Sequence, residues 1–274
     1  MIARDNPYQP YLGRVESVIA ETPTVKTFAL TMQQPMPFRA GQFVQLTLPG
    51  VGEAPFTPSS SPLESERLEL TVIRTGSVTN RLHEVDPGAV LGVRGPFGKG
   101  YPIDKHRGKD VLVVGGGCGL APLRSLIYVL MNSANEYGKI AIKYGAREPA
   151  ELVYRSHYER WVASAPNISM EVTVDAASPG WDGHVGVVTT LLDHLDLDIG
   201  KAVAFSCGPE VMLRFVTVKL LEVGFRPEQI YLSMNRRMSC GMGKCGRCNI
   251  GPYYLCKDGP DMNYALLQHY KDVF

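Results

Sequence analysis

Residues 110–130 read DVLVVGGGCGLAPLRSLIYVL, and this stretch decides the fold of the central part of the chain. The apolar run at 110–114 predicts a buried strand, the glycines at 115–119 predict a tight turn, and the apolar residues at 120–130 predict a helix. Strands that alternate with helices predict a parallel sheet covered by helices on both faces. Further strand patterns, separated by helical patterns, follow at 139–144, 168–174, 201–206 and 229–233.

One predicted helix of this region has residues typical of a helix start and of a helix end. Pro209 suits its first turn and Gly224 suits its end, because proline fits the start of a helix and glycine fits the position after it. The residues between them predict an apolar stripe that faces the core, formed by Val211, Met212, Phe215, Val216 and Leu220.

The first hundred residues follow a different pattern. β-Branched and aromatic residues recur at alternate positions, which is typical of strands with one buried face. Pro and Gly interrupt the pattern, and no long helical pattern separates the segments. A small antiparallel β-barrel is therefore predicted. Its strands are expected at 12–20, 25–32, 42–48 and 68–74.

The end of the chain carries the most specific motif. Residues 239–256 read SCGMGKCGRCNIGPYYLC, so the cysteines follow the spacing C-x4-C-x2-C-x7-C. This spacing is typical of the plant-type 2Fe–2S site, which predicts the metal ligands Cys240, Cys245, Cys248 and Cys256. The glycines permit a tight wrap of backbone N–H groups, and nearby cations offset the negative cluster: Arg236, Arg237, Lys244 and Arg247. A structural zinc site is the alternative, although it usually pairs its cysteines in two knuckles.

Composition limits the remaining possibilities. The chain has 274 residues, enough for more than one core, and a formal net charge of +1 with no basic block, so nucleic acid is not an expected partner. Residues 1–10 contain no secretory pattern, and the apolar stretch at 111–120 is too short and glycine-rich for a membrane span. A cytoplasmic location is expected. Six cysteines in such a chain favour metal or site roles over disulfides.

The glycine-rich turn is a candidate phosphate site. Glycines between a strand and a helix let the backbone approach a pyrophosphate, whose charge is met by N–H groups at the helix start. A packing turn without a ligand is the alternative. The predicted contacts with a dinucleotide are Gly116, Gly117, Gly119, Leu120, Ala121 and Pro122.

A second strand end carries Cys207, Gly208 and Pro209. Ligands of open α/β sheets bind beyond the carboxyl ends of the strands, so Cys207 is expected to face the nicotinamide, with Gly208 and Pro209 beside the cofactor. An equally weighted alternative makes Cys207 a small buried apolar residue. Cys118 is interpreted as a loop residue without chemistry.

The combination of these motifs resembles the ferredoxin–NADP reductase superfamily. The cysteine-rich end makes the chain similar to a narrower group of electron-transfer subunits. These are the gamma subunits of cytoplasmic NAD(P)-linked hydrogenases of the sulfhydrogenase type, the corresponding subunit of anaerobic sulfite reductase, and the dihydroorotate dehydrogenase electron-transfer subunit. The stretches most like the hydrogenase subunits are 50–62, 93–102, 119–127 and 184–193. The resemblance implies an FAD-binding β-barrel at 1–105, an NAD(P)-binding α/β domain at 106–234 and a 2Fe–2S segment at 235–274.

The flavin site is implied by the same resemblance. The family's Arg-x-Tyr-Ser/Thr motif falls on residues 54–57, so Pro55 and Phe56 would lie against the ring and Thr57 would hydrogen-bond its reactive nitrogen. Alanine stands at 54 in place of the arginine, so a phosphate or ribityl contact must come from elsewhere. The family's second motif implies a pyrophosphate contact, for which an ordinary turn into a helix is the alternative. The residues concerned are Val72, Ile73, Arg74, Gly76, Ser77, Val78 and Thr79.

Nucleotide choice depends on Asp175 at the end of a predicted strand. An acid there would repel a 2′-phosphate and accept from ribose hydroxyls, which favours NADH. Arg147 and Arg155 would reverse the preference for NADH if they reach the same pocket. The alternative interpretation is that Asp175 is an ordinary turn residue.

The predicted function is hydride exchange between NAD(P)H and FAD, followed by exchange of single electrons with a 2Fe–2S cluster. No segment is left for a terminal substrate, so iron–sulfur and catalytic partner subunits are expected, with a hydrogenase preferred. Sulfite reductase, dihydroorotate dehydrogenase or a self-contained reductase are alternatives within enzymes. A redox-inert zinc-binding assembly module is the alternative of another class. Thr57 and Cys207 are the residues expected at the reacting atoms.

Overall fold

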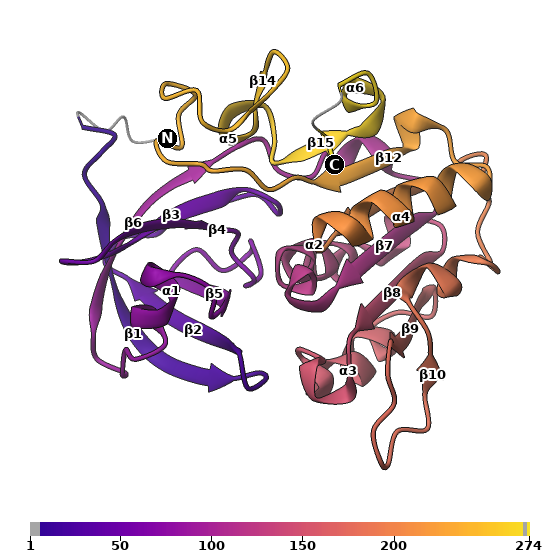
Figure 1. Cartoon of the computed structure of the whole chain (residues 1–274), viewed down its shortest axis with the longest axis horizontal. Coiled ribbons are helices and arrows are strands. Elements are labelled where there is room, and N and C mark those ends of the chain that lie inside the picture. Colours follow the sequence, from indigo (N-terminus) through magenta and orange to yellow (C-terminus); the bar gives the residue numbers. More distant parts are fainter. Residues whose placement is uncertain (1–5, 271–272) are drawn as a thin grey trace.

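The N-terminal strands form one antiparallel sheet in a computed structural model that describes residues 6–270 and 273–274. The six strands lie in the order β4-β3-β6-β1-β2-β5, and the sheet curls so that its edge strands β4 and β5 approach each other (Figure 1). This confirms the predicted antiparallel, barrel-like fold. The elements are β1 Tyr11–Ala20, β2 Val25–Met32, β3 Phe43–Leu48, β4 Gly52–Phe56, β5 Arg67–Ile73, α1 Ser77–Leu82 and β6 Val90–Phe97.

Alternation along these strands fills the interior of the curled sheet. Phe28, Leu30 and Leu46 are fully buried in its apolar core. Two parts of the sequence predictions fall on residues that the structure does not describe. Residues 1–5 belong to the stretch in which no secretory pattern was found, and residues 271–272 belong to the predicted 2Fe–2S segment.

The second sheet has central strands that are buried on both faces. It has seven strands in the order β10-β9-β8-β7-β11-β12-β15, parallel throughout except for β15. The prediction of a parallel sheet is confirmed, and β7 lies at the point where the strand order reverses. The strands are β7 Val111–Gly116, β8 Ile140–Ala146, β9 Ile168–Val174, β10 His184–Val185, β11 Val203–Cys207, β12 Ile230–Ser233 and β15 Asp261–Asn263.

Helices cover both faces of this sheet. Val111 and Val113 of β7 pack in one core with α2 and α3, whereas Leu112 and Val114 pack in the other core with α4. The helices are α2 Leu120–Asn132, α3 Tyr158–Ala163 and α4 Glu210–Glu222. Short 3-10 turns complete the connections at Ile103–His106, Gly117–Gly119, Ala134–Glu136, Pro149–Glu151, Arg155–His157, Val188–Leu192 and Pro227–Gln229.

The structure corrects three details of this domain. Among the described residues, the connection from β9 to β11 contains no α-helix, only β10 and the turn Val188–Leu192. The strand predicted at 229–233 pairs with a further strand, β15, which the sequence pattern did not predict. The stripe predicted on α4 is wrong at two of its five residues. Val211 and Phe215 are 63% and 60% exposed. The predicted Val216 and Leu220 are buried, and Leu213 and Thr217 are buried beside them. Val211 and Phe215 were included because the exposed side of the helix is apolar too.

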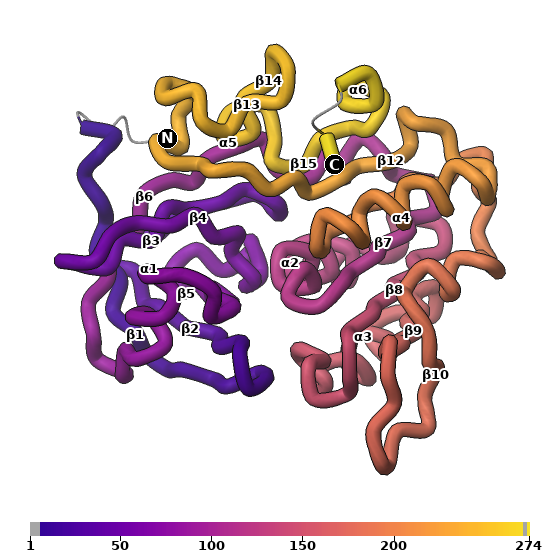
Figure 2. The backbone as a smooth tube through the Cα atoms, in the orientation of Figure 1, coloured from indigo at the N-terminus to yellow at the C-terminus, as the bar shows by residue number. Residues whose placement is uncertain are grey.

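The C-terminal residues lie along one side of both sheets (Figure 2). Cys248, Leu255 and Cys256 are buried in the same core as α4 and β12. The Lys99 N–H, just after β6, donates to the Gly259 carbonyl at 2.7 Å. The segment therefore joins barrel and parallel sheet. Its elements are β13 Asn249–Ile250, β14 Tyr253–Tyr254, α5 Leu255–Asp258 and α6 Tyr264–Leu267.

Among the described residues, no helix has the length and apolar character that crossing a membrane requires.

Candidate functional site

The turns after β7 and β11 touch each other at the point where the strand order of the parallel sheet reverses. A Cβ on Gly119 would lie 2.4 Å from the Cys207 carbonyl oxygen and 2.6 Å from the Gly208 Cα, so only glycine fits. This is the place where open α/β sheets bind their ligands. The structure thus brings the two predicted dinucleotide segments together.

Backbone groups are what this place offers to a ligand. Leu120 and Ala121 are buried, so they face it only through the backbone. Within the described part of the chain, no side chain caps the N-terminus of α2 or of α4. The first N–H groups of two helices of 13 residues each therefore lack side-chain acceptors, as a pyrophosphate site requires.

Packing also explains part of the glycine pattern. A Cβ on Gly116 or Gly208 would lie 2.1 or 2.3 Å from the Met212 sulfur of α4. These two glycines make room for Met212, which fits the alternative interpretation of a packing turn at these positions. The need for glycine at 119 is different, because the contact there is with backbone of the neighbouring turn.

Both isolated cysteines are neutral thiols at ordinary pH. Burial raises the pKa of Cys207 to about 12, with the Asp261 carboxyl adding to the shift. Burial also raises the pKa of Cys118 to about 12. Cys118 lies in a 3-10 turn and its sulfur contacts the backbone of Ile73, at the end of β5. Cys207 is 8% exposed, which leaves both interpretations of this residue in agreement with the structure.

A pocket of about 780 Å³ opens on the barrel beside β4 and the end of β5. We call it the barrel pocket. It brings together four of the predicted flavin residues, Pro55, Phe56, Ile73 and Thr79. Its other lining residues are Glu53, Thr75, Asn235, Arg236, Arg237, Met238 and Ser239.

The other predicted flavin residues are not among those that line the barrel pocket in the described structure. Val72 is buried in the barrel core, and Arg74 is exposed, with its Nε donating to Asn80 at 3.3 Å. Thr57 is half-buried just after β4. Gly76, Ser77 and Val78 begin α1 beside the pocket residue Thr79.

The turn at the start of α1 is held by its own side chain. Thr79 Oγ1 accepts hydrogen bonds from the N–H groups of Thr75 and Gly76 at 2.9 and 2.8 Å, and donates to the Gly76 carbonyl at 3.1 Å. These bonds are those of an ordinary turn into a helix. The Thr79 hydroxyl is consequently engaged within the turn.

One wall of the barrel pocket is formed by residues 235–239, which we call the linker and which no sequence pattern indicated. It runs without regular secondary structure from β12 to Cys240. Arg236 and Arg237 were assigned to the cluster charge alone, yet they also line the barrel pocket. Glu53 was missed as well. Burial alone would raise the pKa of Glu53, but hydrogen bonds from Arg94 and Thr47 outweigh that effect and lower the pKa, so the carboxyl is charged.

The cysteine loop surrounds its sulfurs with backbone donors. The N–H groups of Met242 and Lys244 donate to Cys240 Sγ at 3.4 and 3.3 Å, and that of Gly243 donates to Cys256 Sγ at 3.0 Å. Although burial alone would raise it, such N–H donors lower the pKa of Cys240 to about 6. The loop's glycines take left-handed φ angles of 71° to 77° at 241, 243 and 246.

The four cysteines form two pairs of contacting side chains, Cys240 with Cys245 and Cys248 with Cys256. The sulfurs of Cys248 and Cys256 lie 3.3 Å apart and buried, whereas Cys245 is exposed. Burial and the neighbouring Cys248 raise the pKa of Cys256 to about 12. Within the described residues, no three His, Cys, Asp or Glu side chains gather to hold a single metal ion. Thiols in two places around a loop rich in N–H donors fit a two-iron cluster better than one zinc ion.

The predicted nucleotide-selecting residue lies on the same edge of the sheet, two strands from the glycine-rich turn. Asp175 follows β9 and is exposed, and its N–H donates to the Ala146 carbonyl at 2.9 Å. Arg147 adjoins it but is held by Glu151 through bonds of 2.8 and 2.6 Å. Arg155 is exposed in the 3-10 turn before α3.

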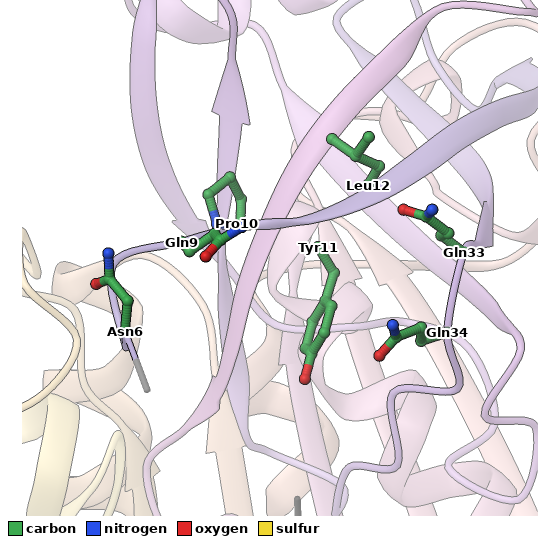
Figure 3. A pocket seen from close by; sticks show the side chains of 7 residues that line it. All are labelled: Asn6, Gln9, Pro10, Tyr11, Leu12, Gln33 and Gln34. Atoms are coloured by element: carbon green, nitrogen blue, oxygen red, sulfur yellow. The ribbon is translucent and has the colours of Figure 1, made fainter. Parts of the chain in front are cut away.

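The barrel carries a second pocket, of about 560 Å³, at the start of β1 (Figure 3). None of the predicted site residues lines it, and none of its lining side chains is charged. These residues are Asn6, Gln9, Pro10, Tyr11, Leu12, Gln33 and Gln34.

Comparison with known families finds three matches along the chain. Residues 13–101 match the oxidoreductase FAD-binding domain, and residues 113–217 match the oxidoreductase NAD-binding domain. Residues 235–268 match the iron–sulfur cluster binding domain of dihydroorotate dehydrogenase B. The predictions of FAD, a nicotinamide dinucleotide and an iron–sulfur cluster as cofactors are confirmed.

Individual proteins are similar over almost the whole chain. Sulfhydrogenase 1 subunit gamma of Pyrococcus furiosus is 37% identical, covering 96% of this chain and 94% of its own. A probable dihydroorotate dehydrogenase B (NAD(+)), electron transfer subunit, of Methanocaldococcus jannaschii is 34% identical over 92% and 89%. The structure of an NADH-dependent reduced ferredoxin–NADP oxidoreductase superposes with a TM-score of 0.73 at 25% identity, covering 98% of this chain and 93% of that one.

Proposed function

This chain belongs to the family of FAD- and NAD-binding electron-transfer subunits that includes the sulfhydrogenase gamma and dihydroorotate dehydrogenase B electron-transfer subunits, and on that premise we propose its reaction. A hydride passes from NAD(P)H to FAD, carrying two electrons and one proton. The electrons then leave singly through a 2Fe–2S cluster to a partner subunit. The cluster would be held by Cys240, Cys245, Cys248 and Cys256.

One observation carries this proposal. The linker that forms a wall of the barrel pocket runs directly into Cys240, so the pocket and the first cysteine are neighbours along the chain. On the other side, Cys118 of the glycine-rich turn contacts Ile73, which also lines the pocket. A flavin in the barrel pocket would therefore lie between the dinucleotide turn and the cysteine loop.

The chain's own residues bind and orient in this scheme. Phe56 supplies a ring face for the flavin, and Thr57 supplies a hydroxyl at the end of β4. Arg236 and Arg237 supply the positive charge that alanine at 54 cannot. Cys207, a neutral buried thiol, packs against the nicotinamide and excludes water. Hydride transfer needs no protein acid or base at the reacting atoms, so positioning is the protein's contribution.

The nucleotide preferred is NADH. Asp175 is exposed at the sheet edge, where it would accept from ribose hydroxyls and repel a 2′-phosphate. Arg147, its basic neighbour, is already paired with Glu151.

The partner we favour is a hydrogenase with its iron–sulfur subunit, in the cytoplasm. Two sulfhydrogenase gamma subunits of Pyrococcus furiosus, at 37% and 33% identity, support this choice. Dihydroorotate dehydrogenase is the second candidate, because its electron-transfer subunits are similar at 34% identity.

The domain bounds that we propose are 1–105 for the FAD-binding barrel, 106–234 for the NAD(P)-binding domain and 235–274 for the 2Fe–2S segment.

Native purification tests the partner. The chain should copurify with a hydrogenase from its own cell, and the isolated chain should reduce viologens with NAD(P)H without evolving hydrogen or reducing sulfite. Charge reversal at Arg247 should weaken the complex, more strongly at low salt, because the docking face is proposed to lie near the cysteine loop. Copurification with a dihydroorotate-oxidising flavoprotein would establish the second candidate. A complete physiological reduction by the lone chain would refute both.

A further inference from the structure

Two buried polar side chains of the barrel hold the chain on either side of Ser239, just before the cysteine loop. Gln45 of β3 and Arg94 of β6 are direct cross-strand partners and are 1% and 3% exposed. Gln45 Nε2 donates a hydrogen bond to the carbonyl oxygen of Met238. Arg94 Nη1 donates to the carbonyl oxygen of Cys240 at 3.5 Å. Two adjacent strands therefore fix the carbonyl of the linker residue Met238 and that of Cys240.

Arg94 also reaches the wall of the barrel pocket. Its Nε and Nη2 donate to the two carboxylate oxygens of Glu53 at 2.7 and 2.5 Å, and Nη1 donates to the Pro7 carbonyl at 3.3 Å. The rings of Tyr8 and Phe97 lie 5.7 and 5.5 Å from the guanidinium carbon. A buried guanidinium is tolerated when its donors are satisfied in this way. One side chain thus touches both the pocket wall and the first cysteine.

The cysteine loop lies against the same strand. A Cβ on Gly241 would lie 2.7 Å from the ring of Phe97, the last residue of β6, so backbone and ring are in close contact. Gly241 follows Cys240 directly. The position of Cys240 is consequently determined by β3 and β6 rather than by the loop alone.

We propose that Gln45 and Arg94 are positioning residues that dock the cysteine loop on the flavin barrel, and that the charge of Arg94 favours the reduced cluster. This rests on the proposed function, in which one electron at a time leaves the flavin and enters the cluster with no bond formed or broken. Docking sets the separation of the two centres. The Arg94 guanidinium offsets the negative charge of Glu53 and donates to the Cys240 carbonyl, so its charge stabilises a neighbouring centre that gains an electron and raises the reduction potential of that centre.

The two roles are separable by substitution. Gln45→Ala removes a hydrogen bond without changing charge and leaves a buried carbonyl unpaired, which disfavours the docked loop by about tenfold. Arg94→Lys keeps the charge but loses the planar guanidinium, whose several N–H donors bind Glu53 and the Cys240 carbonyl at the same time. Arg94→Met removes both. The matched control is Arg14→Met, an exposed arginine on the adjacent strand β1.

The test uses the full chain carrying FAD and its cluster. The cluster's midpoint potential is measured by EPR-monitored redox titration, and stopped flow separates flavin reduction by NADH from cluster reduction. Gln45→Ala and Arg94→Lys should slow cluster reduction by about tenfold, with flavin reduction and midpoint potential near the wild-type values. Arg94→Met should also shift the potential to more negative values, and Arg14→Met should change neither.

The possible failures are distinguishable. If wild-type protein holds FAD and a cluster, but all three variants match Arg14→Met in potential and in cluster reduction, the positioning proposal is wrong and the proposed function stands. If anaerobically prepared wild type holds no iron–sulfur cluster, both are wrong. Should Arg94→Met fail to fold, Gln45→Ala and Arg94→Lys still decide the positioning role, and an unshifted potential in Arg94→Gln would refute the charge effect.

Discussion

The glycine-rich turn and the cysteine loop both depend on glycine, but for different physical reasons. Gly119 has an ordinary right-handed backbone, φ −65°, and is required because a side chain would meet the turn after β11. Gly246 has a left-handed backbone, φ +74°, with no atom within 4 Å of an added Cβ among the described residues. One region is built by close packing of regular elements, and the other by backbone angles that aim N–H groups at sulfur.

The largest expected effect of breaking the cysteine loop is loss of the cluster. Cys245→Ser should abolish the EPR signal of the reduced cluster while FAD stays bound, because the barrel pocket does not include this exposed residue. Cys118→Ser is the matched control and should keep the signal. A full signal in Cys245→Ser would remove this residue from the ligand set.

The two glycines should respond unequally to alanine. Gly119→Ala forces a Cβ to within 2.4 Å of a carbonyl oxygen, so we expect a loss of about 1–3 kcal/mol in the free energy of unfolding and weaker NADH binding. Gly246→Ala should cost about 1 kcal/mol through its backbone angle alone and leave NADH binding unchanged. Chemical denaturation and nucleotide titration measure both. Equal effects on NADH binding would contradict the distinction.

A buried acid lies where the two sheets meet the C-terminal segment. Asp261 Oδ1 accepts from Ser233 Oγ at 2.6 Å, and burial raises the pKa of Asp261 to about 8. The folded state therefore keeps this proton over a range in which the unfolded state releases it. Its stabilising contribution is complete below about pH 4 and declines by about 1.4 kcal/mol per pH unit as the pH rises toward 8. Asp261→Asn should make the melting temperature depend less on pH between about pH 4 and 8. If wild type and Asp261→Asn show parallel plots of melting temperature against pH, the raised pKa of Asp261 is wrong.

At the dinucleotide end, Cys207→Ala should slow flavin reduction by NADH without loss of iron. The neutral thiol packs where the nicotinamide is proposed to lie. Removing it loosens that contact, so the rate of flavin reduction should fall by about tenfold. Stopped-flow flavin bleaching measures the step. An unchanged rate would identify Cys207 as a core residue only.

The smallest expected effect concerns nucleotide choice. Wild type should prefer NADH, and Asp175→Ser should gain several-fold in relative kcat/KM with NADPH, since it removes a charge that repels the 2′-phosphate. A clear NADPH preference in the wild type would show that Arg147 and Arg155 dominate.

Local sequence patterns predicted what depends on local structure. Alternation and glycine placement located four of the six barrel strands and five of the seven strands of the parallel sheet, but not β4, β6, β10 and β15. Cysteine spacing indicated the cluster. The barrel pocket was only half predicted, because its second wall is the linker, which returns to the barrel from the far end of the chain. The Glu53–Arg94 pair depends on the register of β3, β4 and β6, which an alternating pattern does not fix. The α4 stripe was misplaced because the helix is apolar on two sides.

The most direct test of the electron path is anaerobic titration of the isolated chain with NADH, followed by visible absorbance and EPR on the same samples. We expect NADH to bleach the flavin and then to produce the signal of a reduced 2Fe–2S cluster, in protein that contains iron and acid-labile sulfide. Stoichiometric zinc in place of iron, or a flavin that is fully reduced while the cluster stays oxidised, would contradict it.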